Sequence, residues 1–378
     1  MIKSPIHRII AANRYIHQQN NWPDFYWNTE NLTKKLGEVR YRQGKILGQM
    51  SALGFDLREE TILQTLTLDV TKSSEIEGVM LDNEQVRSSI AKRLGIEIAG
   101  VIPPERHVDG AVEMMLDAIQ HYQQPLSMER LNNWHGALFP TGRSGLYKIK
   151  VAELRDGPMQ VVSDAMGKEK IHFEAPSTER LSAEMTKFIN WFNNDQHLDP
   201  VIKAALAHIW FVTIHPFDDG NGRITRVITD MFLARADQTE NRFYSMSAQI
   251  QKDRNQYYEI LEKTQKGSLD ITAWINWFLD CLYRAMDSTD LILDAIRTRT
   301  LFWEVNRNTV FNVRQQKMVD QLLDGFFGNL TVSKWSKITK ASKDTALRDI
   351  QDLVKKNILL QQGAGRSTNY KLNDESFN

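Results

Sequence analysis

The sequence has almost no cysteine and no excess of either charge, and both absences narrow the classes of protein it can encode. Cys281 is the only cysteine among 378 residues, which excludes an intrachain disulfide or a cysteine zinc cluster and fits a reducing cytoplasm. Basic and acidic residues number 47 each. This balance argues against wholesale attraction to nucleic acid or membrane surfaces. We therefore expect a cytoplasmic protein.

Long apolar runs are also missing. The N-terminal stretch MIKSPIHRIIAANRYIHQQNN has no continuous apolar run of signal-peptide length. Nothing in the chain approaches the ~18 uninterrupted apolar residues of a membrane span, so we expect no membrane partner. Contents of 42% hydrophobic and 25% charged residues are ordinary for a soluble globular protein. The length leads us to expect about two to three domains.

The most informative segment is His215–Arg226, which reads HPFDDGNGRITR. Before it, Asp199–Ile214 has apolar residues at helical spacing after an Asp-Pro start, which predicts a mostly buried helix that delivers His215 at its end. Gly220–Gly222 lets the backbone take positive φ and turn its N–H groups toward one point. Helical periodicity resumes over Arg223–Ala236. The start of that helix predicts an anion site.

Four side chains of this segment have the chemistry of nucleotide transfer. Arg223 and Arg226 lie three residues apart on one helix face, and guanidinium groups suit phosphate oxygens. Asp219 offers hard oxygens of the kind that hold Mg²⁺ against a phosphate. The imidazole of His215 can take a proton from a hydroxyl near neutral pH. The alternative is structural: a surface turn, solvated arginines and a histidine that caps a helix.

This segment resembles the Fic family signature, His-x-Phe-x-Asp/Glu-Gly-Asn-Gly-Arg-x-x-Arg. It matches at every specified position, namely His215, Phe217, Asp219, Gly220, Asn221, Gly222, Arg223 and Arg226. The resemblance implies a mainly α-helical enzyme that uses ATP and Mg²⁺ for protein AMPylation. Such an enzyme transfers AMP to a Tyr, Thr or Ser hydroxyl and releases pyrophosphate.

The resemblance also implies a role for each residue. His215 would be the general base, Asp219 the Mg²⁺ ligand, and Phe217 a core anchor for the loop. The anion hole would be formed by Gly220, Asn221 and Gly222, and the outer phosphates would be held by Arg223 and Arg226. The related Doc branch, which phosphorylates its targets, usually has lysine at the position of Gly222 and lacks the second arginine. Arg226 therefore favours AMP transfer.

A second motif, SSEIEG, lies upstream. The helix predicted over Ile62–Glu77 places Ser73 and Glu77 on one face, with Gly78 as its C-cap. A carboxylate at a helix C-terminus needs a compensating cation, and Arg226 is a candidate. The motif resembles the Fic inhibitory signature Ser/Thr-x-x-x-Glu-Gly/Asn, which implies that Glu77 occupies the guanidinium that should bind the γ-phosphate. A solvated helix-end carboxylate is the alternative.

Helical periodicity breaks over Gly145–Pro176, where a short extended run follows Gly157-Pro158. This run resembles the Fic flap, a β-hairpin whose edge accepts a target segment as an added strand. An ordinary surface hairpin is the alternative. The candidate docking residues are Met159, Gln160, Val161 and Val162.

The segment Arg254–Gln265 resembles the part of the family fold whose tyrosines flank the adenine, which makes Tyr257 and Tyr258 candidates for nucleotide binding. Adjacent residues of a helix point to different faces, so we expect at least one of the two to be a packing residue. His208, seven residues before His215, suggests a metal pair. Because no third ligand accompanies it, we expect a hydrogen-bonded core histidine.

We expect three units joined by a connector. Residues 1–57 form a small N-terminal helical module that resembles one found with a Fic subgroup, and residues 58–290 form the Fic catalytic domain with its inhibitory helix. A connector helix spans 291–308, and 309–378 form a third unit. The N-terminal module combines an amphipathic stretch with four aromatic residues that we assign to the core, Trp22, Phe25, Tyr26 and Trp27.

The third unit reads as three helices and a hairpin whose turn spans Gly363–Gly365. It resembles a winged helix-turn-helix with Ser342–Lys356 as the recognition helix. Acidic residues interrupt the charge of that helix at Asp344, Asp349 and Asp352. Winged helices bind DNA, dock proteins or form dimers, so all three remain open. The unit is locally basic through Lys334, Lys337, Lys340, Lys343, Lys355, Lys356 and Arg366.

These observations together predict an AMP-transferring enzyme that is held down by Glu77. Two alternatives remain open: a de-AMPylating enzyme in which Glu77 orients water, and a DNA-binding regulator whose Fic domain senses nucleotide. The sequence does not identify the protein substrate, and AMPylation of the protein itself is among the options. It also does not identify which hydroxyl-bearing residue accepts AMP. Nor does it decide between a monomer and a homodimer.

Overall fold

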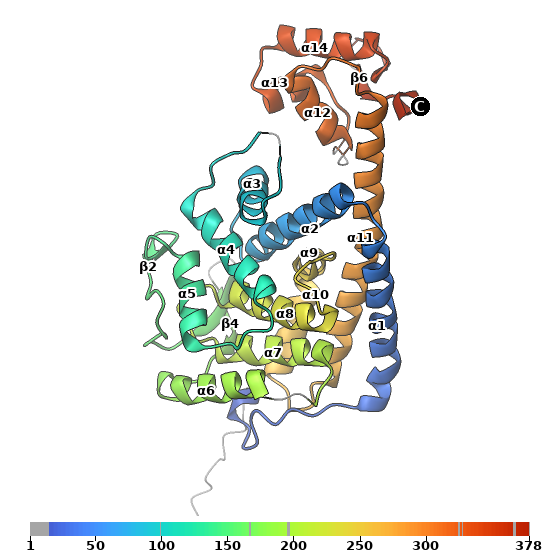
Figure 1. Cartoon of the computed structure of the whole chain (residues 1–378). Coiled ribbons are helices and arrows are strands. Elements are labelled where there is room, and N and C mark those ends of the chain that lie inside the picture. Colours follow the sequence, from blue (N-terminus) through green and yellow to red (C-terminus); the bar gives the residue numbers. More distant parts are fainter. Residues whose placement is uncertain are drawn as a thin grey trace, which may run out of the picture. The chain divides into compact units, whose positions relative to one another are not determined.

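In a computed structural model of the chain, the structure describes residues 15–98, 100–165, 168–194, 197–323, 326, 328–365 and 368–377. Two compact units are present, Met1–Thr289 and Asp290–Asn378. The division between the two units lies at residue 290, and residue 57 falls inside the first unit. The described part is mainly helical, with fourteen α-helices and three two-stranded antiparallel sheets (Figure 1). The mainly α fold class is therefore confirmed.

The first unit consists of eleven helices and two hairpins, and its last helix continues into the second unit. The helices are α1 (Thr29–Ser51), α2 (Phe55–Ile76), α3 (Asn83–Leu94), α4 (Arg106–Gln120), α5 (Met128–Leu138), α6 (Thr178–Asn194), α7 (Pro200–Ile214), α8 (Asn221–Asp237), α9 (Met246–Lys252), α10 (Arg254–Gln265) and α11 (Thr272–Val305). The strands are β1 (Arg143–Ser144), β2 (Tyr147–Lys148), β3 (Gln160–Ala165) and β4 (Lys168–Glu174). No membrane-spanning helix is found within the described residues.

The centre of this unit is α7, which is buried on every face because nearly all of its residues are apolar. Asp199 caps its N-terminus by accepting from the Val201 N–H, and Pro200 occupies the first turn, where a missing N–H costs nothing. α7 packs between α6 and α8 (Figure 1). The loop between α7 and α8, which carries the predicted site, is therefore mounted on two buried helices.

His208 is a hydrogen-bonded core histidine of α7, as expected. Its Nδ1 lies 2.9 Å from Thr229 Oγ1 and its Nε2 lies 2.9 Å from the Tyr257 hydroxyl. Thr229 donates its own proton to the Thr225 carbonyl, so it accepts from Nδ1–H, and Tyr257 donates to Nε2. No group of three or more metal-ligating side chains exists among the described residues.

The protonation of His208 makes the free energy of unfolding depend on pH. Burial, aided by the positive charge of Arg226, lowers the pKa of His208 from 6.5 to about 3. Between these values the unfolded chain binds a proton that the folded chain does not. Stability is therefore unaffected above about pH 6.5 and falls as the pH drops toward 3. We expect His208→Gln to remove this contribution, about 1.4 kcal/mol per pH unit. Urea unfolding of both proteins at about pH 7, 6 and 5 measures it, and identical pH slopes would contradict the assignment.

The N-terminal segment packs onto the helical core. Trp22 is buried, donates from Nε1 to Glu184 at 2.8 Å, and meets Trp210 of α7 edge to face. α1 is held by an ion pair between Arg40 and Asp199 at 2.8 Å. The assignment of the aromatic residues to the core is correct for Trp22 but wrong for Tyr26, which is 56% exposed and contributes backbone pairing instead.

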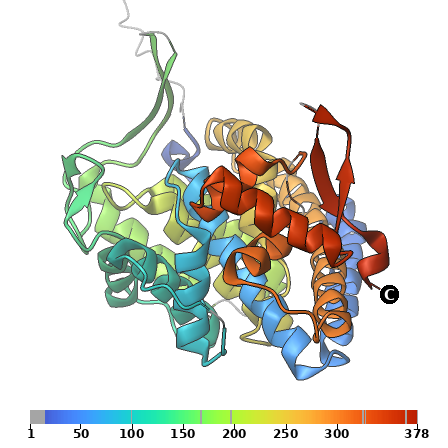
Figure 2. The same cartoon turned by 90° about the horizontal axis from the view of Figure 1, so that it is seen from above.

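The second unit is built around three short helices and a hairpin (Figure 2). These elements are α12 (Val313–Leu323), α13 (Val332–Thr339), α14 (Lys343–Lys355), β5 (Leu359–Gln362) and β6 (Asn369–Leu372). Their common core includes Trp335, Ile350 and Leu359, all completely buried. The expected order of helices and hairpin is confirmed. The expected connector is not a separate helix, because residues 291–305 continue α11, and Arg366 lies outside the described residues.

Candidate functional site

His215 follows α7 in the left-handed conformation, with φ of 51° and ψ of 59°, which few non-glycine residues adopt. Its N–H donates to the Phe211 carbonyl at 3.0 Å, and its Nδ1 lies 3.1 Å from the Val212 carbonyl oxygen. A carbonyl only accepts, so Nδ1 carries the proton in the neutral ring and Nε2 keeps its lone pair. The backbone thus selects the tautomer in which Nε2 can accept a proton.

The surroundings of His215 keep the ring neutral. Burial lowers the pKa of His215 below 6.5, and the nearby positive charge of Arg155 lowers it further, against the opposing effect of the Val212 hydrogen bond. A neutral imidazole at neutral pH accepts a proton from a hydroxyl without first losing one.

The side chain of Asn221 fixes the conformation of the loop after His215 by bonding to the backbone of Phe217. Its Oδ1 accepts from the Phe217 N–H at 3.0 Å, and its Nδ2 donates to the Phe217 carbonyl at 2.8 Å. Phe217 is completely buried and stacks on His135 with ring centroids 4.4 Å apart. The side chain of Asn221 therefore shapes the loop, and its contribution to an anion site comes from its backbone.

Helix α8 begins two residues earlier than expected, at Asn221 rather than Arg223. Gly220 caps it with φ of 78°, but Gly222 lies within the helix, so the expectation of positive φ across the whole glycine-bracketed segment is wrong. The N–H groups of Asn221, Gly222 and Arg223 belong to the first helical turn, where no carbonyl of the helix itself reaches them. They form the predicted anion-binding end of α8.

Asp219 lies in the loop between α7 and α8, directly before Gly220. Its Oδ1 accepts from the Gly220 N–H at 2.5 Å, its Oδ2 accepts from the Ser144 hydroxyl, and its carbonyl accepts from His135 Nε2 at 3.1 Å. His135 Nδ1 accepts a hydrogen bond from the Ala152 N–H, which assigns Nε2 as the donor. Two hydrogen bonds thus orient the carboxylate, and a third holds the backbone of Asp219.

Arg155 was not predicted from the sequence, although it anchors the loop. It is 3% exposed, and its guanidinium donates to the carbonyls of His215 at 2.8 Å, Gly157 at 2.8 Å and Pro176 at 2.6 Å. It therefore ties the loop at His215 to Gly157 and Pro176, which flank the β3–β4 hairpin. Its position 60 residues before His215 gives no local pattern, and neither does that of Ser144 or His135.

The two arginines of α8 differ in their partners. Arg223 is 7% exposed, lies with Cζ 4.9 Å from the ring centre of Phe139, and has a buried Nε without a hydrogen-bond partner in the described structure. Arg226 is 2% exposed and donates to Ser73 Oγ at 2.9 Å and to the Ser73 carbonyl at 2.7 Å. Nε of Arg223 and Nη1 of Arg226 are thus buried donors that the described protein atoms leave unused.

Glu77 completes the site from α2, which ends one residue before it. Its Oε1 accepts from Arg226 Nη2 at 2.8 Å. Burial alone would lower the pKa of Arg226, but the Glu77 carboxylate outweighs this and raises it. Gly78 follows with φ of 79° and turns the chain away. The structure thus brings Ser73, Glu77 and Gly78 to the start of α8.

The same carboxylate explains why residue 222 is glycine. A Cβ at Gly222 would overlap Glu77 Oε1 and lie 2.8 Å from Glu77 Cδ and 3.3 Å from Arg226 Nη1. A side chain at this position would therefore have to displace the Glu77 carboxylate, whereas the backbone φ of Gly222 is ordinary.

We expect Gly222→Ala to destabilise the protein by only about 1 kcal/mol, because its Cβ would displace the far end of the flexible Glu77 side chain at the expense of the hydrogen bond to Arg226, and to cost less when Glu77 is also replaced by alanine. Denaturant unfolding of the four proteins of this double-mutant cycle measures the coupling. An equal cost of Gly222→Ala in both backgrounds would show that Glu77 does not cover Gly222 in solution.

The two candidate tyrosines differ in exposure. Tyr257 is completely enclosed by its contacts with His208 and neighbouring rings, so it is a packing residue. Tyr258 is 39% exposed, its hydroxyl donates to the Ile76 carbonyl at 3.3 Å, and Arg254 Cζ lies 5.6 Å from its ring centre. Of the pair, Tyr258 alone presents a ring surface near the end of α2.

The flap segment forms the hairpin β3–β4, with Gln160 paired to Glu174 and a register shift between Val161 and Val162. Met159 precedes the strand, and its carbonyl accepts from the Ala175 N–H at 3.0 Å. Both valines are exposed, at 37% and 44%. The predicted docking residues therefore lie at the base of an isolated two-stranded hairpin.

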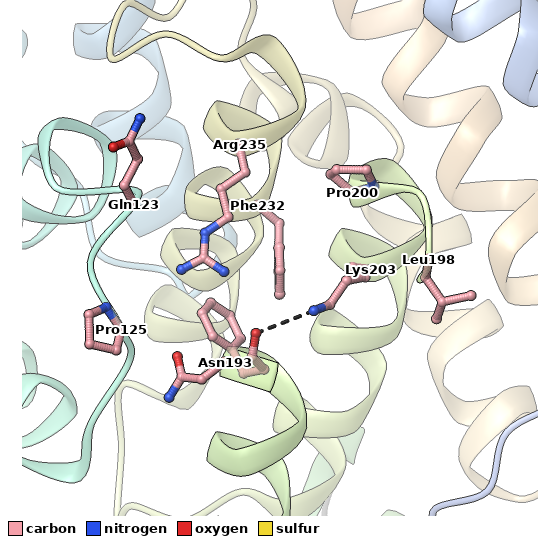
Figure 3. Close-up of a pocket in the computed structure, with 9 residues that line it drawn as sticks. Gln123, Pro125, Asn193, Leu198, Pro200, Lys203, Phe232 and Arg235 are labelled. Atoms are coloured by element: carbon pink, nitrogen blue, oxygen red, sulfur yellow. Dashed lines mark hydrogen bonds between the residues drawn. The ribbon is translucent and has the colours of Figure 1, made fainter. Parts of the chain in front are cut away.

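A cavity of about 380 Å³ lies at the far end of α7 and α8, where Lys203 and Arg235 flank Phe232 (Figure 3). Both cations contact its ring, at 5.0 and 5.1 Å. Arg235 also donates to the carbonyls of Tyr122 and Gln124. Because α7 and α8 each run about 20 Å from this cavity to the loop at His215, the cavity is separate from the predicted site.

Two protein-family models match parts of this chain, and one of the two matched ranges includes the loop at His215. The Fic/DOC family model matches residues 125–233, and a domain of unknown function, DUF4172, matches residues 15–96. The protein adenylyltransferase Fic of Drosophila grimshawi is 36% identical over 114 residues, 30% of this chain and 22% of that protein. The same enzyme of Culex quinquefasciatus is 35% identical over 114 residues, 30% of this chain and 21% of that protein. The chain thus spans about a fifth of the length of these curated relatives.

Two solved structures share the fold. A Fic family protein from Desulfovibrio desulfuricans G20 aligns with a TM-score of 0.51 at 18% identity, over 92% of this chain and 98% of that one. A Fic domain containing signaling protein from Bacteroides thetaiotaomicron VPI-5482 aligns with a TM-score of 0.51 at 22% identity, over 68% of this chain and 97% of that one. The chain is therefore similar to the Fic/DOC family over residues 125–233 and to DUF4172 over residues 15–96, and it is distantly similar to the Fic adenylyltransferases.

Proposed function

We propose that this protein transfers AMP from ATP to a hydroxyl group of a protein. The observation that carries the proposal is the pairing of a neutral imidazole, protonated at Nδ1 and free at Nε2, with the N-terminus of α8 and the unpaired Nε of Arg223. A base and an anion cradle on one loop suit a reaction in which a hydroxyl attacks a phosphate.

In the proposed reaction the hydroxyl oxygen of the target attacks the α-phosphorus of ATP. The new O–P bond forms as the bond between the α-phosphorus and the bridging oxygen breaks, and pyrophosphate leaves. The hydroxyl proton passes to Nε2 of His215. The first-turn N–H groups of α8 and the guanidinium of Arg223 stabilise the negative charge on the phosphate oxygens.

The residues present fit a magnesium ion held together with substrate phosphates. Mg²⁺ commonly uses only one or two protein carboxylates, and Asp219 supplies one, oriented by Ser144 and the Gly220 N–H. When bound, Mg²⁺ neutralises phosphate charge at this position. Asp219 would give up the Ser144 hydrogen bond to ligate it.

We further propose that Glu77 inhibits the enzyme. Its carboxylate covers Gly222 and occupies Nη2 of Arg226, which would otherwise bind the γ-phosphate. A phosphate placed there would meet a negative charge and lose a charged donor. ATP would then bind with its phosphates displaced from the geometry of attack.

The test is transfer of label from α-phosphate-labelled ATP with Mg²⁺, using wild type, Glu77→Gly and a cell lysate as acceptor. Label in protein from the α-phosphate and none from the γ-phosphate would support AMP transfer. Label from the γ-phosphate alone would replace the proposal with phosphate transfer. No label in either variant, with folded protein that still binds ATP, would contradict it, and release of AMP from a pre-labelled target would then favour AMP removal.

A further inference from the structure

A buried histidine of α5 joins two segments that are distant from it in the sequence. His135 is completely buried. Its Nδ1 accepts from the Ala152 N–H at 3.0 Å, and its Nε2 donates to the Asp219 carbonyl at 3.1 Å. One nitrogen of a neutral imidazole accepts while the other donates, so both ring positions are used. An apolar side chain of similar size would fill the same space but would make neither hydrogen bond.

The imidazole ring and the end of α5 also pack against the loop between α7 and α8. The ring of His135 stacks on Phe217, with centroids 4.4 Å apart and planes 21° apart. Phe139, which follows α5, lies so close to Gly220 that a Cβ there would be 2.8 Å from its Cε2 atom. Close packing of this kind leaves the loop little room to shift. To these apolar contacts His135 adds a directional one, its hydrogen bond to the Asp219 carbonyl.

The segment that contains Ala152 runs antiparallel to the same loop. The Lys150 N–H donates to Asp218 Oδ2 at 2.8 Å. Further along the chain, the Arg155 N–H donates to the Pro216 carbonyl at 2.9 Å. Between these two bonds Ala152 has φ of 59°, a conformation that few non-glycine residues adopt. The hydrogen bond to the imidazole of α5 helps to hold it, in the segment that leads to β3 of the flap.

The position of the Asp219 carboxylate depends on the same bridge. Its oxygens accept from the Gly220 N–H and from the Ser144 hydroxyl, and the bond from Ser144 would be given up to a metal ion. The backbone of Asp219, held at its carbonyl by His135 Nε2, must then keep the carboxylate in place. This matters because Mg²⁺ requires nearly ideal octahedral geometry, with ligands at about 2.0–2.1 Å.

We propose that His135 is a positioning residue for Mg²⁺-bound ATP. It holds the backbone of Asp219 so that the carboxylate meets the metal, and it holds Ala152 so that the segment before the flap keeps its place beside the loop. The inference rests on the proposed function, because it takes Asp219 as the metal ligand. It requires no change in the protonation of the ring.

The test compares His135→Gln with His135→Met in a Glu77→Gly background. The two new side chains have nearly the same length, but only the amide can accept from the Ala152 N–H and donate to the Asp219 carbonyl. Calorimetry measures the binding of ATP in Mg²⁺ and of ATP in EDTA. We expect His135→Met to weaken the binding of Mg²⁺-bound ATP by about 10- to 100-fold, the range typical when a group that orients a metal ligand is lost. Binding of metal-free ATP should stay nearly unchanged, and His135→Gln should keep most of the affinity for Mg²⁺-bound ATP.

Hydrogen exchange of the Ala152 amide gives a readout without nucleotide. This amide should exchange faster in His135→Met than in His135→Gln, because its acceptor is lost. Thr289→Val, which removes a buried hydrogen bond to the Phe243 carbonyl, is the matched control and should change neither this exchange nor the effect of Mg²⁺. Should His135→Met fail to fold, His135→Asn takes its place, because its amide is too short to reach both partners.

Equal affinities of His135→Met and His135→Gln for Mg²⁺-bound ATP would overturn the inference. An equal loss of affinity with and without Mg²⁺ would also overturn it, because general loosening of the loop has that effect. A Glu77→Gly parent that binds ATP equally with and without Mg²⁺ would be a different failure. It would remove the metal role of Asp219, on which the proposed reaction and this inference both depend.

Discussion

Replacing His215 by alanine in a Glu77→Gly background is expected to lower AMP transfer by about 10²- to 10⁴-fold, the range typical for loss of a general base. The hydroxyl would have to lose its proton to water, because no second neutral imidazole points from this loop. The double variant should still bind ATP, since the phosphate ligands lie on α8 and not on the histidine. Incorporation of α-phosphate label, with nucleotide binding measured by calorimetry, separates the two effects.

His107→Ala is the matched control, because His107 is exposed and lies outside the loop. It should leave the rate of Glu77→Gly unchanged. The lowered pKa of His215 adds a pH signature: the ring is neutral above that pKa, so the rate should begin to fall only below about pH 6.5. Transfer at the parental rate in the His215→Ala double variant would remove His215 from the chemistry.

Replacing Glu77 by glycine is expected to raise AMP transfer by about ten- to a hundred-fold. A charged hydrogen bond contributes about 1.5–3 kcal/mol, and the change returns Nη2 of Arg226 to the phosphate while uncovering Gly222. The gain should persist at saturating ATP, because the carboxylate misplaces the bound phosphates as well as weakening binding. Initial rates over a range of ATP concentrations, with label in the α-phosphate, measure both parts.

Glu75→Gly is a close control for this variant. It makes the same change two residues away on α2, but Glu75 binds Lys72 and Gln251 rather than Arg226. It should leave AMP transfer near the wild-type rate, although it loosens the end of the helix. Equal activation by both variants would point to general loosening of α2, and no activation by Glu77→Gly would exclude Glu77 as an inhibitor.

The sequence predicts the helices best where the apolar pattern is strong or a cap is clear. α7 ends at Ile214, as expected, and α10 has the bounds of the segment singled out for its tyrosines. α2 begins at Phe55 rather than Ile62, because the charged run before Ile62 hides the apolar face. α11 passes through the expected domain boundary without a cap, since nothing in Asp290 or its neighbours ends a helix.

The site is predicted in part for a similar reason. The residues within one motif follow from local spacing and charge. The pairing of Glu77 with Arg226, 149 positions apart, was expected from the resemblance of the two motifs to Fic signatures, and the ion pair is present. The roles of Arg155, Ser144 and Gly222 depend on contacts with residues that are distant in the sequence. The partners are His215, Asp219 and Glu77, which lie 60, 75 and 145 positions away, respectively. No local pattern encodes such contacts, because each is created only when the chain has folded.

Because the ring of His215 is fixed, a target in the proposed reaction would have to bring its hydroxyl group to Nε2 in the correct position. With its backbone N–H, its carbonyl and its Nδ1 all engaged, the imidazole has little room to follow a misplaced hydroxyl. A segment that added to β3 one residue out of step would present its hydroxyl to the opposite face of the hairpin. Selectivity would then depend on the register in which the target strand pairs with β3. The length of the extended stretch would matter more than the chemical identity of its side chains.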